Sequence, residues 1–163
     1  MQMQAQQAAA QMAMQTNEAE TQSKIAVKEA EVAFDQGEVP IGCVIVKEGR
    51  VISRGSNQME SLKDPTAHSE IIAIGAASGS QSDNWRLDDC TLYVTLEPCP
   101  MCAGALVQAR VGQVIFAATD PKRGAMGSTV NLATHVSAHH RMTVIGGVQA
   151  EEAKEMLSSW FKQ

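Results

Sequence analysis

The chain lacks a long apolar run. No stretch of its 163 residues approaches the roughly 18 consecutive apolar residues that indicate a membrane-spanning helix. It also lacks a basic excess: 13 Lys and Arg stand against 18 Asp and Glu, which gives a formal net charge of -5. Nucleic-acid binders usually carry a basic balance. The composition therefore argues against a membrane partner and mildly against a large polyanion, but it leaves room for a local basic patch.

Cysteine is scarce, and four cysteines are too few for a disulfide scaffold in a chain of this length. The N-terminal stretch MQMQAQQAAAQMAMQ has no Lys or Arg and no continuous apolar centre, so it does not have the pattern of a signal peptide. We therefore expect a cytoplasmic protein with reduced thiols. We interpret residues 1–16 as a low-complexity tail that can extend the first helix, and residues 17–163 as one domain.

Hydrophobic residues make up 44% of the chain, which is typical of a globular domain. The periodicity predicts helices over 17–37, 68–77, 100–109 and 151–161, and strands over 41–46, 51–54, 91–95, 112–118 and 142–148. Asn17 and Thr66 are the expected N-caps of the first two helices, and residues 120–140 are expected to form loop and short helix. The alternation of strands and helices predicts an α/β domain whose sheet is covered on both faces.

One short motif places His68 and Glu70 two residues apart, in the stretch PTAHSE, at a predicted helix start. Taken alone, such a pair is usually a capped and solvated turn. Whether this pair has a chemical function depends on the other motifs in the chain.

A second motif, C-x-x-C, is formed by Cys99 and Cys102. In a cytosolic protein it indicates a redox pair, half of a structural zinc site or part of a catalytic metal site. A structural zinc site needs four protein ligands, and no second pair is present. Cys43 lies inside a predicted strand and Cys90 just before one, so both are expected to be buried core thiols. The remaining histidines lie in a polar connecting region and are expected at the surface: His135, His139 and His140.

His68, Cys99 and Cys102 remain as three ligands, which with a water in the fourth position make a catalytic zinc site. Both ligand segments open helices, whose positive ends favour thiolates. On an ideal helix Glu70 lies about 200° around from His68, so we expect it to stay off the metal and face the bound water. There it would act as general base and then as general acid.

The combination H-x-E followed by P-C-x-x-C is the signature of zinc deaminases, in which an activated water attacks the ring carbon that bears an amino group and ammonia leaves. We therefore expect one Zn²⁺ per chain and a hydrolytic deaminase.

From about residue 25 to residue 161 the sequence resembles the bacterial tRNA-specific adenosine deaminases, which convert the wobble adenosine of a tRNA anticodon to inosine. The first motif and the cysteines are shared with the wider cytidine-deaminase-like superfamily, whereas segment 120–128 and the aromatic C-terminus favour the tRNA enzymes. The matching stretches are GEVPIG (37–42), DPTAHSE (64–70), LYVTLEPCPMCAGA (92–105), TDPKRGAMGS (119–128), HR (140–141) and SSWF (158–161).

The resemblance implies a cytidine-deaminase-like α/β/α sandwich with a five-stranded mixed sheet, and a homodimer in which both subunits help to bind one tRNA. It implies that Asn57 hydrogen-bonds the target base and that Asp120 lies beside the sugar-phosphate. Phe161, with Trp160, would lie near the anticodon loop. The residues themselves leave alternatives open: Asn57 is also typical of a turn after a strand, and the two aromatic side chains could pack on the core.

Two features separate this chain from a simple match. Ser69 stands where the family usually has Ala, and PCPMC also occurs in guanine and cytosine deaminases. An RNA substrate would need a local positive field from a few basic side chains, namely Lys122, Arg123, Arg141 and Lys162.

Two alternatives to a tRNA adenosine deaminase follow. A free-base deaminase acting on guanine or cytosine would need no basic surface, which agrees with the net charge of -5. A non-catalytic zinc module could serve as an RNA-binding subunit, but such a module has no need for the proton carrier Glu70.

Overall fold

Five strands form one mixed sheet: β1 (Gly42–Lys47), β2 (Arg50–Ser56), β3 (Cys90–Leu96), β4 (Gln113–Ala118) and β5 (Thr143–Gly146). A computed structural model describes residues 2–163, without the side chains of residues 13–15; Met1, the first residue of the predicted tail, lies outside the described residues. The strand order is β2-β1-β3-β4-β5. β1 is antiparallel to both of its neighbours, whereas β3, β4 and β5 are parallel. The predicted five-stranded mixed sheet is therefore confirmed.

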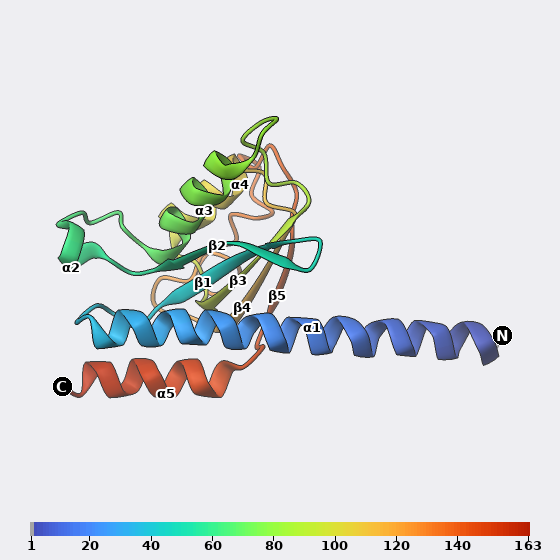
Figure 1. The fold of residues 1–163 in the computed structure, drawn as a ribbon, viewed down its shortest axis with the longest axis horizontal. Helices are drawn as coiled ribbons and strands as arrows, with labels where there is room; N and C mark the ends of the chain where they lie inside the picture. The colour runs from blue at the N-terminus through green and yellow to red at the C-terminus, as the bar shows by residue number, and fades with distance from the viewer. Residues whose placement is uncertain (1) are drawn as a thin grey trace.

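Helices cover both faces of this sheet: α1 (Gln2–Asp35), α3 (Ser69–Ser80), α4 (Pro100–Gln108) and α5 (Ala150–Phe161). The short helix α2 (Met59–Leu62) lies in the connection between β2 and α3. α1 and α5 lie side by side on one face, and α3 and α4 lie on the other (Figure 1). This arrangement is the expected three-layer α/β/α sandwich.

The apolar run of β1 serves both layers. Successive residues of a strand point to opposite faces of the sheet. Cys43 and Ile45 join the core beneath α3 and α4, while Val44 and Val46 join the core beneath α1. A strand buried on both faces needs apolar residues at every position, which explains the continuous run. Cys43 and Cys90 are both buried, as predicted.

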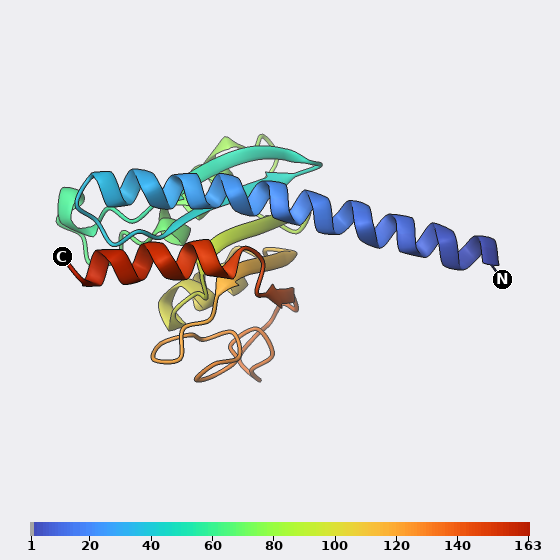
Figure 2. The same ribbon diagram turned by 90° about the horizontal axis from the view of Figure 1, so that it is seen from below.

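The first helix begins before residue 17, so residues 2–16 of the predicted tail extend it, as expected. α1 runs without a break from Gln2 to Asp35, so the expected N-cap at Asn17 is wrong. Gln, Met and Ala favour helix as strongly as the residues that follow, so propensity does not fall at Asn17. Its N-terminal half projects beyond the sheet (Figure 2). The division into a tail and a domain at residue 17 stays a prediction. Among the described residues, no helix is both long enough and apolar enough to cross a membrane.

Two connecting segments also differ from expectation. Residues 120–140 contain turns and a single bridge between Met126 and Asn131, so the short helix expected there is wrong. The one-turn helix α2 was not expected, because its four residues are too few for a periodic pattern.

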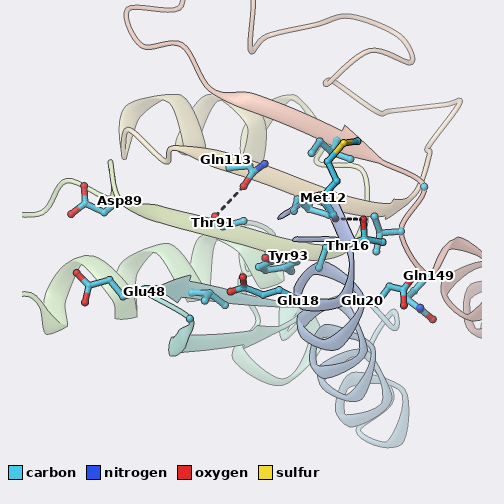
Figure 3. A pocket seen from close by; sticks show the side chains of 17 residues that line it. Met12, Thr16, Glu18, Glu20, Glu48, Asp89, Thr91, Tyr93, Gln113 and Gln149 are labelled. Atoms are coloured by element: carbon cyan, nitrogen blue, oxygen red, sulfur yellow. Dashed lines mark hydrogen bonds between the residues drawn. The ribbon is translucent and has the colours of Figure 1, made fainter. Parts of the chain in front are cut away.

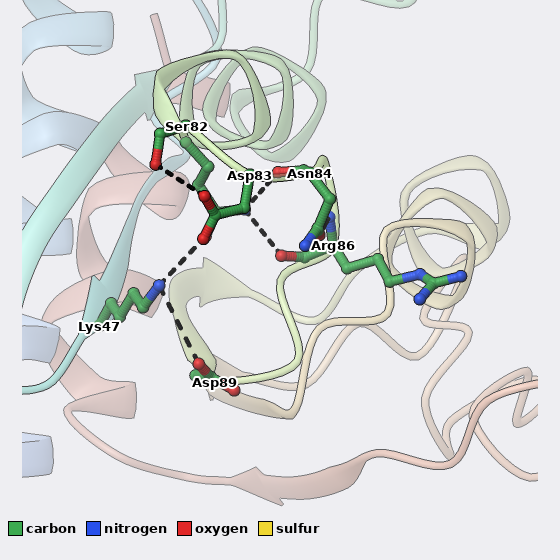
Figure 4. A network of polar contacts seen from close by, with 7 residues as sticks. Lys47, Ser82, Asp83, Asn84, Arg86 and Asp89 are labelled. Atoms are coloured by element: carbon green, nitrogen blue, oxygen red, sulfur yellow. Dashed lines mark hydrogen bonds and ion pairs between the residues drawn. The ribbon is translucent and has the colours of Figure 1, made fainter.

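A polar network fixes the connection from α3 to β3 (Figure 4). The side-chain amide of Gln81 donates hydrogen bonds to the carbonyls of Asn84 and Arg86, at 3.2 and 2.7 Å. From β1, the Lys47 ammonium reaches Gln81 at 3.3 Å and Asp89 at 4.0 Å. The start of β3 is thereby tied to β1, and its far end leads directly to the C-x-x-C motif.

Candidate active site

His68 and Cys99 occupy equivalent positions, each directly before a helix. His68 precedes α3 with φ -74° and ψ 153°, and Cys99 precedes α4 with φ -72° and ψ 172°. Pro100 is the first residue of α4, as predicted. Because the N-terminal end of a helix is positive, both ends favour a thiolate close by.

The expected N-cap at Thr66 is wrong, and α3 begins two residues later than that cap would require. Asp64 is the reason, because its Oδ1 accepts hydrogen bonds from the Thr66 amide at 2.8 Å and the Thr66 hydroxyl at 2.7 Å. These bonds form a turn ahead of the helix. His68 is consequently extended while Glu70 is helical, so the change of backbone conformation, and not a helical angle, separates their side chains.

The three predicted ligands meet in one cluster. The Nδ1 atom of His68 lies 3.6 Å from the Cys99 sulfur and 3.5 Å from the Cys102 sulfur. A tetrahedral zinc with bonds of about 2.0–2.1 Å to nitrogen and about 2.3 Å to sulfur separates such ligands by about 3.5–3.6 Å. The donor set and its spacing therefore fit Zn²⁺, with Nδ1 as the ligating atom of His68.

The two thiols of the pair differ in protonation, because the hydrogen bond between them favours a thiolate at Cys99 and a neutral thiol at Cys102. The hydrogen bond with the Cys102 thiol, opposed by burial and reinforced by a hydrogen bond with His68, lowers the pKa of Cys99 to about 3. Cys99 is thus favoured as a thiolate, which is the form that binds metals. The same hydrogen bond, together with burial, raises the pKa of Cys102, so Cys102 has to give up its proton when a metal binds.

No fourth protein ligand joins this cluster within residues 2–163. Cys43 and Cys90 belong to the core. His135 and His139 are exposed, as predicted, but His140 is half-buried and its Nε2 lies 2.8 Å from the Val111 carbonyl oxygen, so the surface expectation is wrong for His140. Three ligands of this kind leave a position for water, which distinguishes a catalytic zinc site from a structural one.

Glu70 is buried beside the cluster, with 4% of its surface exposed. The Ser69 hydroxyl donates a hydrogen bond of 2.6 Å to Glu70 Oε1. Burial raises the pKa of Glu70, and the neighbouring Cys99 contributes in the same direction. A carboxyl whose pKa is raised toward neutrality is suited to accept and return a proton.

A cavity of about 610 Å³ opens beside His68. Its volume lies in the range of small-molecule sites. One wall is apolar, from Val39, Ile41, Met59, Pro65, Leu96 and Leu157. The lining also includes the residues that the family resemblance implied for substrate binding, Asn57, Asp120 and Phe161. Two of the four basic residues expected to supply a local positive field, Lys122 and Arg123, line it as well.

Asn57 and Asp120 also have structural tasks in this cavity. Asn57 Oδ1 accepts the Ser69 amide at 2.8 Å and so holds the start of α3, which leaves Nδ2 as the atom that can donate to a base. Asp120 Oδ1 accepts the amides of Lys122 and Arg123 at 3.0 and 3.1 Å. Asp120 therefore shapes the turn that presents the two basic side chains.

The two C-terminal aromatic residues have different surroundings. Trp160 packs edge-to-face on Phe34 of α1, with ring centroids 5.7 Å apart. Phe161 is 73% exposed and lines the cavity. Trp160 is thus half-buried and packs on a neighbouring helix, whereas Phe161 is free to contact a ligand.

A second cavity of about 640 Å³ lies under α1, on the opposite side of the sheet from α3 and α4 (Figure 3). Thr91, Tyr93 and Gln113 form its floor, and no His or Cys lines it. None of the cluster residues lines it, so it is not the candidate site.

Two buried carboxylates near the site escaped the sequence interpretation. Glu38 accepts the amides of Glu60 and Ser61 at 2.9 and 2.8 Å and so anchors the start of α2. Glu97, between β3 and Cys99, accepts several hydrogen bonds from the segment that follows β4. For Glu97 the available signal was a charged residue directly after β3, a largely buried strand, where burial demands a partner. Glu38 lies four residues before β1 and offered no such signal.

Comparisons with known proteins agree with this geometry. A family model described as MafB19-like deaminase matches residues 16–163. The tRNA-specific adenosine deaminase of Aquifex aeolicus is 47% identical over 140 residues, covering 86% of this chain and 91% of that protein. The tRNA-specific adenosine deaminase of Bacillus subtilis is 46% identical over 140 residues, covering 86% of each chain.

Solved structures extend the comparison. A structure from studies of A-to-I editing by tRNA:A34 deaminases at the wobble position has a TM-score of 0.81 at 42% identity, covering 84% of this chain and 99% of that chain. A guanine deaminase from Nitrosomonas europaea has a TM-score of 0.74 at 20% identity, covering 88% and 85%, and shares the fold alone. The chain therefore belongs to the MafB19-like deaminases and to the family of tRNA-specific adenosine deaminases.

Proposed function

We propose that this protein is a zinc-dependent hydrolytic deaminase that converts the wobble adenosine of a tRNA anticodon to inosine. One observation carries the proposal: a three-ligand cluster with Glu70 buried beside it contributes His68 to the lining of a cavity, in a chain 47% identical to a tRNA-specific adenosine deaminase. The overall reaction consumes water and releases ammonia.

His68, Cys99 and Cys102 would hold the zinc, which in catalytic sites lowers the pKa of a water molecule to about 7. Glu70 takes a proton from the attacking water and delivers it to the amino group that leaves as ammonia. The Ser69 hydroxyl fixes Oε1 of Glu70, so Oε2 is the oxygen available for proton transfer.

We assign substrate contacts to the cavity lining. A base that leaves the stack of the anticodon loop needs hydrogen-bond partners and stacking surfaces in its pocket. Asn57 can donate from Nδ2 to the base, and the exposed ring of Phe161 can stack on a neighbouring one. Asp120 would lie beside the sugar, and the ammonium of Lys122 and guanidinium of Arg123 beside phosphates. This charge would be local, because the whole chain carries -5.

Incubation with two anticodon stem-loops tests this function. One carries adenosine at the wobble position, and the other carries the same adenosine one nucleotide away. The proposal predicts inosine, detected as a nucleoside after digestion, in the first RNA only. No inosine in either RNA, from zinc-loaded protein, would contradict it.

A non-catalytic zinc module is the weaker alternative. Burying the carboxyl group of Glu70 is unfavourable for folding, and a module that only binds RNA gains nothing from it. A proton carrier beside the metal cluster does explain that burial.

We also propose a homodimer on the strength of the family resemblance. Light scattering after gel filtration should then give twice the mass of one chain, and a single-chain mass at micromolar concentration would contradict it.

We further propose that the protein acts in the cytoplasm. The four free cysteines, two of them zinc ligands in this proposal, support a reducing compartment.

A further inference from the structure

Glu97 is a charged residue in the interior. It directly follows β3, and only 2% of its surface is exposed. No Lys or Arg in residues 2–163 forms an ion pair with it. A buried carboxylate without a cationic partner is costly unless hydrogen-bond donors surround it.

All of its side chain's donors come from one segment, residues 119–128, which we call the cavity loop. Glu97 Oε1 accepts the Asp120 amide at 3.2 Å and the Ser128 hydroxyl. Glu97 Oε2 accepts the amides of Met126 at 3.0 Å and Ser128 at 3.1 Å. A single carboxylate therefore holds the beginning and the end of the cavity loop.

The middle of the cavity loop also packs against this carboxylate. A Cβ atom at Gly124 would overlap the Glu97 side chain, so only glycine allows this approach. The Ala125 amide donates a hydrogen bond of 2.9 Å to the Pro98 carbonyl. The cavity loop is thus folded around Glu97 and Pro98, immediately before the zinc ligand Cys99.

The cavity loop carries Asp120, Lys122 and Arg123 into the lining of the cavity that also contains His68. A shift of this loop would move these three side chains relative to the metal cluster. Misplacing a binding group by about 1 Å can cost up to about 10²-fold in rate.

We propose that Glu97 is a positioning residue for the substrate: it fixes the cavity loop to the segment of the zinc ligands, so that substrate contacts and metal keep one relative geometry. This inference rests on the proposed function, because it assigns the cavity loop to the same RNA substrate.

Glu97→Gln tests the inference, since it keeps the shape but turns an accepting oxygen into an NH₂ group that faces N–H donors. Glu31→Gln, at an exposed position of α1, is the matched control. In Glu97→Gln the amides of Met126 and Ser128 should exchange with solvent faster. KM for the wobble-adenosine stem-loop should rise on the order of tenfold, with a smaller change in kcat and unchanged zinc content. Glu31→Gln should match the wild type in every measurement.

Unchanged amide exchange and unchanged KM in Glu97→Gln would overturn the inference. So would loss of zinc with normal exchange in the cavity loop, because Glu97 would then support only the ligands.

If Glu97→Gln does not fold, Ser128→Ala decides, since it removes one donor and leaves the carboxylate with its three amides. It should raise KM less, by roughly threefold, with zinc retained; an unchanged KM would overturn the inference. A wild type that makes no inosine would instead refute the proposed function, while the exchange data would still report on the loop.

Discussion

Glu70 is the residue on which the proposed chemistry depends. Replacing it with Ala should lower deamination by at least about 10²–10⁴-fold, because proton transfer by a positioned carboxylate typically contributes that much. Zinc content should stay near that of the wild type, since Glu70 lies beside the ligands and is not one of them. The two expectations, on activity and on zinc content, are tested by measuring stem-loop turnover and bound zinc in the same preparation. Loss of zinc together with activity would indicate that Glu70 is itself a zinc ligand.

The ligand set gives a second prediction for single residues. Replacing His68 with Ala removes one of three ligands and should release zinc and abolish activity. Cys43→Ala is the matched control, because Cys43 is a buried thiol of the core under α3 and should leave zinc in place. Zinc loss in Cys43→Ala with intact folding would make Cys43 a fourth ligand of the metal and the site structural.

The sequence predicted the ligands well because their spacing follows directly from the chemistry of zinc. It could not predict that Nδ1 of His68 faces the sulfurs, because that depends on the extended backbone before α3. It also could not predict the hydrogen bond between Ser69 and Glu70, or the buried position of Glu97. Each depends on segments that are distant in sequence or on a rotamer, neither of which a local pattern records.

Among the elements, the start of α3 depends on a close approach to β2. A Cβ atom at Gly55 would overlap the Ser69 carbonyl, so Gly55→Ala should lower the free energy of unfolding by about 1–3 kcal/mol. It should also reduce activity by displacing His68 and Glu70. Gly75→Ala, in the middle of α3 with no neighbour near its Cβ position, is the control and should raise stability by about 0.5–1 kcal/mol. Equal denaturation midpoints for both variants would refute the close approach.

The cavity loop supplies a prediction about RNA. Lys122 and Arg123 are exposed side chains of this loop, so changing both to Ala should weaken stem-loop binding. Each lost phosphate contact should also flatten the plot of log binding constant against log salt by about 0.7 for single strands. Turnover of bound RNA should change little, because neither residue is a zinc ligand. An unchanged salt slope would remove this pair from the interface.

Elements were predictable where burial on both faces demands a continuous apolar run, as in β1 and β4, and less so elsewhere. The N-cap of α1 was wrongly placed at Asn17 because a Gln/Met/Ala segment without a buried face shows no periodicity, although it is helical. The short helix expected within 120–140 does not form. In its first part the amides of Lys122, Arg123 and Met126 bond to the carboxylates of Asp120 and Glu97.

For the molecule as a whole, the predicted division at residue 17 can be tested by truncation. Residues 2–12 of α1 are exposed, whereas buried side chains begin farther along, at Gln22 and Ser23. Removing residues 1–16 should therefore leave zinc content and stem-loop turnover unchanged. Removing residues 1–27 should prevent folding, because Ala26 and Val27 belong to the buried layer. Lost activity in the shorter truncation would give the tail a functional role.

The most direct test of the central claim compares substrates with one preparation of zinc-loaded protein. Ammonia release is measured from the wobble-adenosine stem-loop, free guanine and free cytosine, with the Glu70→Ala variant as the blank. The account predicts release from the stem-loop alone, and only when Glu70 is present. Efficient release from guanine or cytosine, with none from the stem-loop, would contradict it and identify a free-base deaminase.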